Sequence, residues 1–231
     1  MDFTLAPDTV LPEDGYRGML IGRVWLPSTN GLPAGPSVVV VAQHGVYDVT
    51  NSYPTSSNLM NTDKPNLAAA NADGAIRIGS PEEILLNSGP DKRNPEKPYF
   101  LAPIDLQSIK ACGVTFIDSL LERLIEEIAK GDSREADNIR ETIGKEIGGD
   151  LSGVRPGSEE AERLTKSLKE RGLWSPYLEV GIGPDAEVFT KAQPMSAVGV
   201  GAEIGIREGS TWNNPEPEAV LIVNSRGELV G

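Results

Sequence analysis

Two glutamates separated by a single residue, Glu216 and Glu218, stand just before an apolar run at residues 219–223. In an extended segment, residues two apart project to the same side, so both carboxylates would point to one place. Two negative charges there repel each other unless a cation lies between them, and Mg²⁺, Mn²⁺ and Ca²⁺ prefer such oxygen ligands. The pair is therefore a candidate metal site, although the spacing alone more often indicates a solvated acidic lead-in to a strand.

Other residues that could do chemistry are few. Glu122 and Arg123 fall on the polar face of a helix predicted at 117–130, where solvated charge is the commoner explanation. Lys191 ends a predicted strand and could anchor a carboxylate. The single histidine, His44, lies in a tight turn, so we expect it to face solvent rather than to serve a catalytic triad or a zinc site. Any chemistry must then depend on carboxylates, lysine, hydroxyl groups or a hard metal ion.

The composition limits the partners. The 231-residue chain has a formal net charge of −13, and a field of this sign repels phosphate backbones, so we expect no nucleic-acid partner. The single cysteine, Cys112, allows no disulfide within the chain, which is typical of a reducing compartment. No stretch approaches the ~20 apolar residues of a membrane span, and the first residues lack the pattern of a signal peptide. We expect a cytoplasmic protein that does not bind membranes.

The first part of the chain is rich in short strand patterns. A strand is predicted at 20–26, and residues 38–49 predict two strands joined at a tight turn that ends in glycine. Polar stretches with several prolines, at 51–66 and 87–98, predict loops. The second loop is the candidate boundary of a small β-rich N-terminal domain, residues 1–98.

The second part mixes helices and strands. Amphipathic periodicity predicts helices at 117–130, 133–147 and 158–171, the last capped by Ser158. Four short apolar segments bounded by glycine or proline predict strands, at 177–182, 187–191, 198–206 and 218–223. We therefore predict an α+β fold, with a second domain at 99–231 that contains a helical insertion.

Three stretches of the second part follow one another in a recognisable order. They are residues 113–122 (Gly-Val-Thr-Phe-Ile-Asp-Ser-Leu-Leu-Glu), residues 184–191 with the pattern Pro-x-x-x-x-Phe-x-Lys, and residues 215–221 with the pattern Glu-x-Glu-x-x-Leu. In this order they resemble the fumarylacetoacetate hydrolase family, over roughly residues 101–231. The resemblance implies the first part of a mixed β-roll catalytic domain, with the helical insertion at 133–172, in which the two glutamates bind Mg²⁺ or Mn²⁺.

The departures from the family pattern point to one branch of it. Ser119 stands where the family has a histidine that helps to activate water, while Glu122 matches the family's glutamate. This version is similar to the sugar-acid branch, which includes dehydratases of 2-keto-3-deoxy-pentonates. The resemblance implies a small keto-acid substrate, proton transfer by Glu122 with Ser119, and Arg123 orienting Glu122 or the substrate carboxylate. Lys191 would bind the substrate, and helices 133–171 would form a lid or pack against the core or a second subunit.

The family's third metal carboxylate is an aspartate that follows the Glu-x-Glu strand by about one hairpin. We expect the chain to lack that part of the catalytic domain, which leaves two alternatives to a dehydratase. One is a hydrolase or isomerase of an acylpyruvate-like diketo acid, and the other is an inactive fragment. The family is typically dimeric or larger, so a homodimer or a higher homo-oligomer is expected for the full-length protein.

Overall fold

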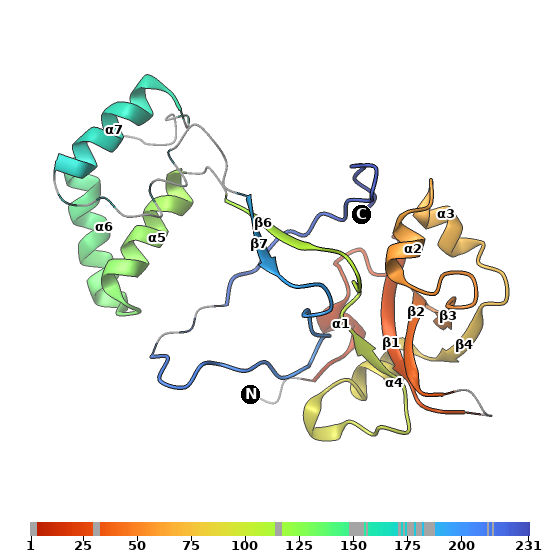
Figure 1. Cartoon of the computed structure of the whole chain (residues 1–231). Helices are drawn as coiled ribbons and strands as arrows, with labels where there is room; N and C mark the ends of the chain where they lie inside the picture. The colour runs from red at the N-terminus through yellow and green to blue at the C-terminus, as the bar shows by residue number, and fades with distance from the viewer. Residues whose placement is uncertain are drawn as a thin grey trace. The chain divides into compact units, whose positions relative to one another are not determined.

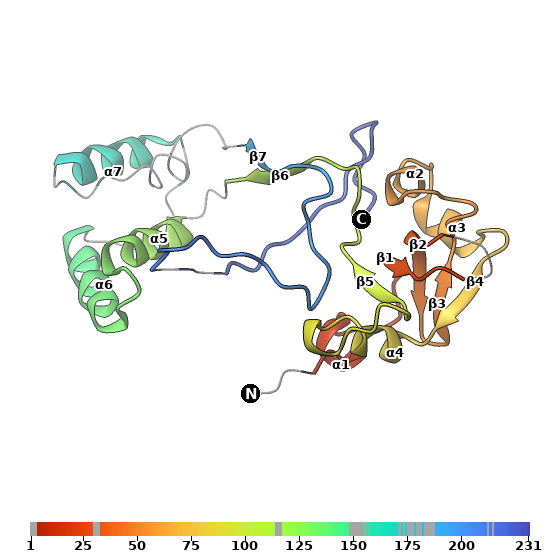
Figure 2. The same cartoon turned by 60° about the horizontal axis from the view of Figure 1, so that its bottom comes forward.

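The computed structural model describes residues 4–29, 33–113, 117–147, 155, 157–170, 172, 174, 178, 182, 188–211, 213 and 215–231. The chain forms two compact units, drawn in Figure 1 and Figure 2. Unit 1 comprises Met1–Ser108, Ala192–Arg207 and Pro215–Gly231, and unit 2 comprises Ile109–Lys191 and Glu208–Asn214. Helices and strands occur in both, which confirms the α+β class, and the described strands form no closed barrel. The domain boundaries at 1–98 and 99–231 stay a prediction.

Unit 1 is built on an antiparallel sheet with the strand order β4-β3-β2-β1-β5 (Figure 2). The strands are β1 Leu20–Leu26, β2 Gly35–Ala42, β3 Gly45–Asp48, β4 Ile76–Gly79 and β5 Tyr99–Leu101. The predicted strand at 20–26 and the predicted hairpin at 38–49 are confirmed. Val41 of β2 pairs with Leu20 of β1 on one side and with Val46 of β3 on the other.

The valine run of β2, residues 38–41, packs on both faces of this sheet. Its even-numbered members contact the apolar cluster around Leu59 of helix α2 (Ser56–Met60). Its odd-numbered members contact the cluster around Ile84 of helix α4 (Pro81–Leu86). Since β-branched side chains fit a pleated surface, a run without alternation is what a strand covered on both sides requires.

The helices of unit 1 are short: α1 Pro7–Val10, α2, α3 Pro65–Ala70, α4 and the 3-10 helix η1 Pro90–Lys92. The prediction of a loop at 51–66 is wrong, because α2 lies inside it and α3 begins at its end. Thr55 caps α2, and its hydroxyl oxygen accepts a hydrogen bond from the backbone N–H of Asn58 at 3.0 Å. Leu59 is fully buried. The polar residues around the cap thus give the sequence of a loop, although the packing of one apolar face stabilises a helix here.

Residues 87–98 form a folded loop around one buried side chain. The Nδ2 atom of Asn87 donates hydrogen bonds to the carbonyl oxygens of Asn94, Lys97 and Pro98 at 3.0–3.1 Å. Its Oδ1 atom accepts a hydrogen bond from the backbone N–H of Asn94 at 2.7 Å. The amide therefore supplies the contacts that a strand or helix would otherwise give this stretch.

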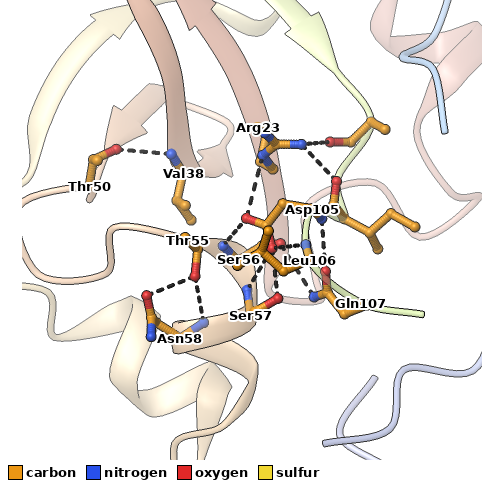
Figure 3. A network of polar contacts seen from close by, with 12 residues as sticks. Arg23, Val38, Thr50, Thr55, Ser56, Ser57, Asn58, Asp105, Leu106 and Gln107 are labelled. Atoms are coloured by element: carbon orange, nitrogen blue, oxygen red, sulfur yellow. Dashed lines mark hydrogen bonds and ion pairs between the residues drawn. The ribbon is translucent and has the colours of Figure 1, made fainter. Parts of the chain in front are cut away.

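A buried carboxylate ties helix α2 to the chain beyond β5 (Figure 3). Asp105 is 3% exposed and accepts hydrogen bonds from the N–H groups of Ser56 at 2.6 Å and Ser57 at 3.1 Å, and from the Ser57 hydroxyl at 2.7 Å. The N–H of Leu106 also donates to it, at 2.7 Å. Burial raises the pKa of Asp105, but these hydrogen bonds outweigh burial, so that the pKa lies below its usual value.

Arg23 of β1 completes this network. Its Nε atom lies 3.7 Å from a carboxylate oxygen of Asp105, and both side chains are nearly inaccessible to solvent. Its Nη1 atom donates to the carbonyl oxygens of Ile104 at 2.7 Å and Ala102 at 3.3 Å. A buried ion pair of this kind is tolerated only when the remaining donors and acceptors are satisfied, as they are here.

Residues 193–207 return to unit 1 without forming a strand, so the predicted strand at 198–206 is wrong. The N–H of Met195 donates to the carbonyl oxygen of Asp105 at 3.1 Å. Gly199 then lies so close to β5 that a Cβ atom at this position would be 2.6 Å from the carbonyl oxygen of Phe100. Only glycine permits this approach, which brings backbone against backbone without a ladder of hydrogen bonds.

The predicted strand at 218–223 is also wrong. Within the described residues, this segment forms only an isolated antiparallel bridge between Val223 and Leu229. The turn between them closes a hairpin whose Ile222 and Val230 pack against the cluster around Leu59. The apolar run therefore ends in a hairpin docked on the core, while its first residues stay outside the core.

Unit 2 contains a two-stranded sheet and three longer helices. The elements are β6 Ile109–Cys112, α5 Ile117–Ala129, α6 Ser133–Ile147, α7 Glu159–Glu170 and β7 Val188–Ala192, with β6 paired to β7. The predicted helices and the strand at 187–191 are confirmed. The Ser158 cap is confirmed too, since its hydroxyl accepts a hydrogen bond from the N–H of Ala161 at 3.2 Å. In the described part of the chain, no helix is long and apolar enough to cross a membrane.

The core of unit 2 corrects one further strand prediction. Its buried members are Leu124, Ile125, Ala161, Leu168, Leu178 and Ile182. Leu178 and Ile182 are helical, which contradicts a strand at 177–182, while the other residues of that segment lie outside the described residues. Residues four apart share one face of a helix, so this pair can enter the core together.

We expect Asp105→Asn to destabilise unit 1 by about 3–5 kcal/mol at neutral pH, because it leaves Arg23 without its buried anion. A carboxylate whose folded pKa is lowered stabilises above its unfolded pKa, and this stabilisation is lost as pH falls through the folded value. Urea unfolding between neutral and acidic pH should show this loss in the parent protein and a flatter profile in the variant. The exposed Asp73, changed to Asn, is the control, and equal midpoints for both variants would contradict the role of the pair.

Candidate functional site

Glu122 is the predicted catalytic residue whose surroundings the structure describes best. It stands on α5 and faces Arg140 of α6. The Nε atom of Arg140 donates to one carboxylate oxygen at 3.0 Å, and Nη2 donates to the other at 2.7 Å. The third nitrogen, Nη1, donates to Asp137 at 2.7 Å. This is the two-pronged geometry in which arginine binds a carboxylate most strongly.

The pair fixes the charge state of Glu122. The hydrogen bonds from Arg140 lower the pKa of the Glu122 carboxyl group and outweigh the effect of its partial burial. The Glu122 side chain is 52% exposed, so solvent screens the interaction and its contribution to stability is small. Glu122 is therefore an ionised carboxylate at neutral pH, suited to accept a proton rather than to donate one.

The turn between α5 and α6 places these residues opposite each other. The helices lie side by side (Figure 1 and Figure 2). Lys130 and Gly131 both adopt positive φ, which ends α5 abruptly. Asp132 then caps α6, and its carboxylate accepts hydrogen bonds from the N–H groups of Arg134 at 2.9 Å and Glu135 at 3.2 Å. A short, capped turn sets the pairing of the two helices.

Arg123 and Ser119 are the other two predicted site residues on α5. The guanidinium group that holds Glu122 belongs to Arg140, whereas Arg123 is exposed. The position of Ser119 on α5 is three residues before Glu122, but its side chain lies outside the described residues. Sequence analysis missed Arg140. Its place three residues after Asp137 on a predicted helix was the available signal, and that signal did not indicate which helix it would face.

Lys191, the predicted substrate-binding residue, lies on β7. It is exposed, and its ammonium group is 5.8 Å from the ring centre of Phe189, near the limit of a cation–π contact. On the neighbouring strand, the Nζ atom of Lys110 donates to the hydroxyl of Thr190 at 2.5 Å. The small sheet thus carries two lysines, of which only Lys191 was predicted.

Glu216 and Glu218 belong to unit 1, whereas Glu122, Arg123 and Lys191 belong to unit 2. Both glutamates lie in an exposed, irregular segment. The apolar residues that follow are exposed too, Val220 by 73% and Leu221 by 69%. The buried strand that should aim the two carboxylates at one point is therefore not formed.

The metal expected from the sequence does not fit the described residues. Among them, no group of three or more histidine, cysteine, aspartate or glutamate side chains is arranged to hold a metal ion. A hard divalent cation takes at least six oxygen ligands, and several of these can be waters. Carboxylates or substrate oxygens then have to fix its position. Two carboxylates on an irregular segment do not supply such a position, so no chemical step is assigned to a metal here.

His44 behaves as predicted. It is exposed in the turn between β2 and β3, where its carbonyl oxygen accepts a hydrogen bond from the Nε atom of Arg77 at 3.0 Å. Cys112 is exposed at the end of β6.

Comparisons with known proteins find a partial similarity to two dehydratases. The chain is 42% identical over 45 residues to the 2-dehydro-3-deoxy-D-arabinonate dehydratase of Saccharolobus solfataricus, which covers 20% of this chain and 15% of that protein. It is 38% identical over 74 residues to the probable 2-keto-3-deoxyxylonate dehydratase of Haloferax volcanii, which covers 32% of this chain and 24% of that protein. The similarity is partial. The chain spans less than a quarter of either relative in these matches.

No family model matches the chain. No solved structure matches it either. What is shown is therefore a weak, partial similarity to dehydratases of 2-keto-3-deoxy sugar acids, the sugar-acid branch of the fumarylacetoacetate hydrolase family.

Replacing Arg140 with glutamine should raise the pKa of Glu122 toward that of an unperturbed glutamate, because both charged hydrogen bonds are lost. Carbon-13 NMR of the side-chain carboxyl group measures the titration directly. The matched control is Arg163→Gln, which removes a more exposed pair with Glu160 on α7 and should leave Glu122 unchanged. An unchanged Glu122 titration in the Arg140 variant would show that the pair does not persist in solution.

Proposed function

We propose that this chain acts in the dehydration of a five-carbon 2-keto-3-deoxy sugar acid. The observation that carries the proposal is the similarity to two proteins named as dehydratases of that substrate class. The two names, arabinonate and xylonate, suggest different substrates. In the 2-keto-3-deoxy derivatives, however, C2 is a keto carbon and C3 is a methylene carbon, so neither is a stereocentre. C4 is the single stereocentre left, so derivatives with one C4 configuration are the same compound, and both names describe one kind of reaction.

The chemistry follows from the position of the keto group. The C2 ketone acidifies the protons on C3, so a base can remove one of them and form an enolate. The electrons of that C–H bond then form a C3–C4 double bond as the C4 hydroxyl leaves, and proton and hydroxyl together make up one water. Tautomerisation of the C5 alcohol end gives 2-oxoglutarate semialdehyde. No oxidant or reductant is needed.

Glu122 is the proposed proton acceptor at C3. Arg140 keeps its carboxylate ionised and orients both oxygens, and one of these two hydrogen bonds has to open before Glu122 takes up a proton. A positioned base contributes about 10²–10⁴-fold to a rate. Ser119 and Arg123 stay proposed neighbours of the reacting group, and Lys191 is the proposed partner of the substrate carboxylate, for which its exposed ammonium group is suited.

The divalent metal remains part of the proposal through the resemblance alone. Glu216 and Glu218 are its proposed ligands, and no step of the reaction is assigned to it. A homo-oligomeric state is proposed on the same basis, whereas the proposal of a cytoplasmic location comes from the composition of the chain, with its single cysteine. A hydrolase of an acylpyruvate-like diketo acid has less support, because both relatives are named dehydratases and Ser119 replaces the histidine that would help to activate water.

The direct test is to incubate the purified chain with 2-keto-3-deoxy-D-arabinonate, with and without Mg²⁺ or Mn²⁺, and to follow the semialdehyde by proton NMR. Turnover should fall by about 10²-fold or more in Glu122→Gln. Glu160→Gln, which alters a comparable carboxylate–arginine pair on α7, should retain full activity. No turnover under any of these conditions would mean that the chain by itself is not a dehydratase. If the chain instead hydrolyses an acylpyruvate-like diketo acid, the alternative function as a hydrolase is favoured.

A further inference from the structure

A short segment of unit 1 has the residue pattern of a strand but no strand partner. In residues 203–207, Glu203, Gly205 and Arg207 alternate with Ile204 and Ile206. Ile204 is 73% exposed and Ile206 is 60% exposed. Within the described part of the chain, no backbone hydrogen bond involves these residues. Exposed isoleucines next to unpaired backbone groups form a surface suited to strand addition.

The pattern complements itself. If two copies of the segment pair antiparallel about a two-fold axis through Gly205, Glu203 of each copy stands opposite Arg207 of the other. On the opposite face, Ile204 of each copy stands opposite Ile206 of the other. Both the charged pair and the apolar pair therefore occur twice, as a two-fold interface requires.

Other registers lose this match. With the axis through Ile206, Ile204 would face Glu208 and Arg207 would face Gly205. With the axis through Ile204, Glu203 would face Gly205. Only the register centred on Gly205 joins opposite charges and joins isoleucine to isoleucine. Register is set by such cross-strand pairs, because a shift by one residue moves every side chain to the other face.

The centre of the segment is also open to an approaching backbone. A Cβ atom built on Gly205 meets no other described atom within 4 Å, and Gly205 is not among the glycines with positive φ. A neighbouring strand can therefore approach without displacing a side chain. We infer that residues 203–207 pair with the same segment of a second copy of this chain, as a two-stranded antiparallel ribbon centred on Gly205.

Such a ribbon is small compared with the interfaces of stable dimers, so the association is weak and depends on protein concentration. This inference does not depend on the proposed enzyme activity. Sedimentation velocity over about a hundred-fold range of protein concentration should show a monomer–dimer equilibrium. A single monomeric species over the whole range would overturn the inference.

Charge reversal tests the register. Arg207→Glu places a glutamate opposite Glu203 at both ends of the ribbon and should weaken association by about tenfold. The double variant Glu203→Arg with Arg207→Glu restores opposite charges and should restore association. Arg17→Glu changes the net charge by the same amount at an exposed site elsewhere and should have no effect. Equal association of the single and double variants would contradict the proposed pairing.

A covalent test reports on the axis itself. In the antiparallel ribbon, residue 205 of each copy lies about 4.5–5.5 Å from its counterpart, within the range of a disulfide. In a Cys112→Ser background, Gly205→Cys should form a disulfide-linked dimer on mild oxidation. Gly18→Cys, which likewise has open space around the added atom, should stay monomeric. Equal cross-linking of both variants would mean that collisions, rather than the ribbon, bring the thiols together.

Discussion

A single buried carboxylate organises unit 1. Asp105 satisfies the first N–H groups of α2, and Arg23 brings β1 to the same place. Its carbonyl oxygen also accepts a hydrogen bond from the N–H of Met195, so residues that are far apart in sequence meet at one position. Because a buried charge without partners is costly, each of these contacts offsets part of the cost of burying the carboxylate. The sheet supplies the apolar area of unit 1, and Asp105 determines how helix and connecting segments are arranged around it.

Sequence reasoning succeeded where the deciding contacts are local. The hairpin of β2 and β3, the cap at Ser158 and the helices of unit 2 depend on residues within a few positions of one another. It failed for residues 198–206 and 218–223, because alternation predicts which side chains share a face but not whether a neighbouring strand exists. It missed α2 because the helix begins at a polar cap and its buried apolar residues are only Leu59 and Met60. A local sequence pattern therefore forms a strand or a helix only where another segment of the chain packs or pairs with it.

The candidate site shows the same limit for side chains. Glu122 was recognisable from its motif, but its charge state is set by Arg140, eighteen residues later on another helix. The turn from Lys130 to Asp132 makes that meeting possible. Gly131 marks the end of α5 in the sequence, but it does not indicate which side chains of the two helices will meet. Conversely, Glu216 and Glu218 have the spacing of metal ligands without the strand that would aim them. Residue types indicate what chemistry is possible, whereas the packing of elements decides which groups are ready for it.

The C-terminal hairpin has a consequence for how the protein is made. The N–H of Ser225 donates to Asn61 at a sequence separation of 164, and Val230 packs on the core that β2 began. A ribosome adds about 5–20 residues per second, so the early sheet waits many seconds for the residues that cover it. Unit 2 lies inside this long loop and consists mainly of local helices, which fold faster than long-range contacts form. The helices of unit 2 can thus fold before unit 1, although unit 1 begins earlier in the sequence. Chaperones would then meet a nascent chain in which the first-synthesised sheet is the last part to complete its core.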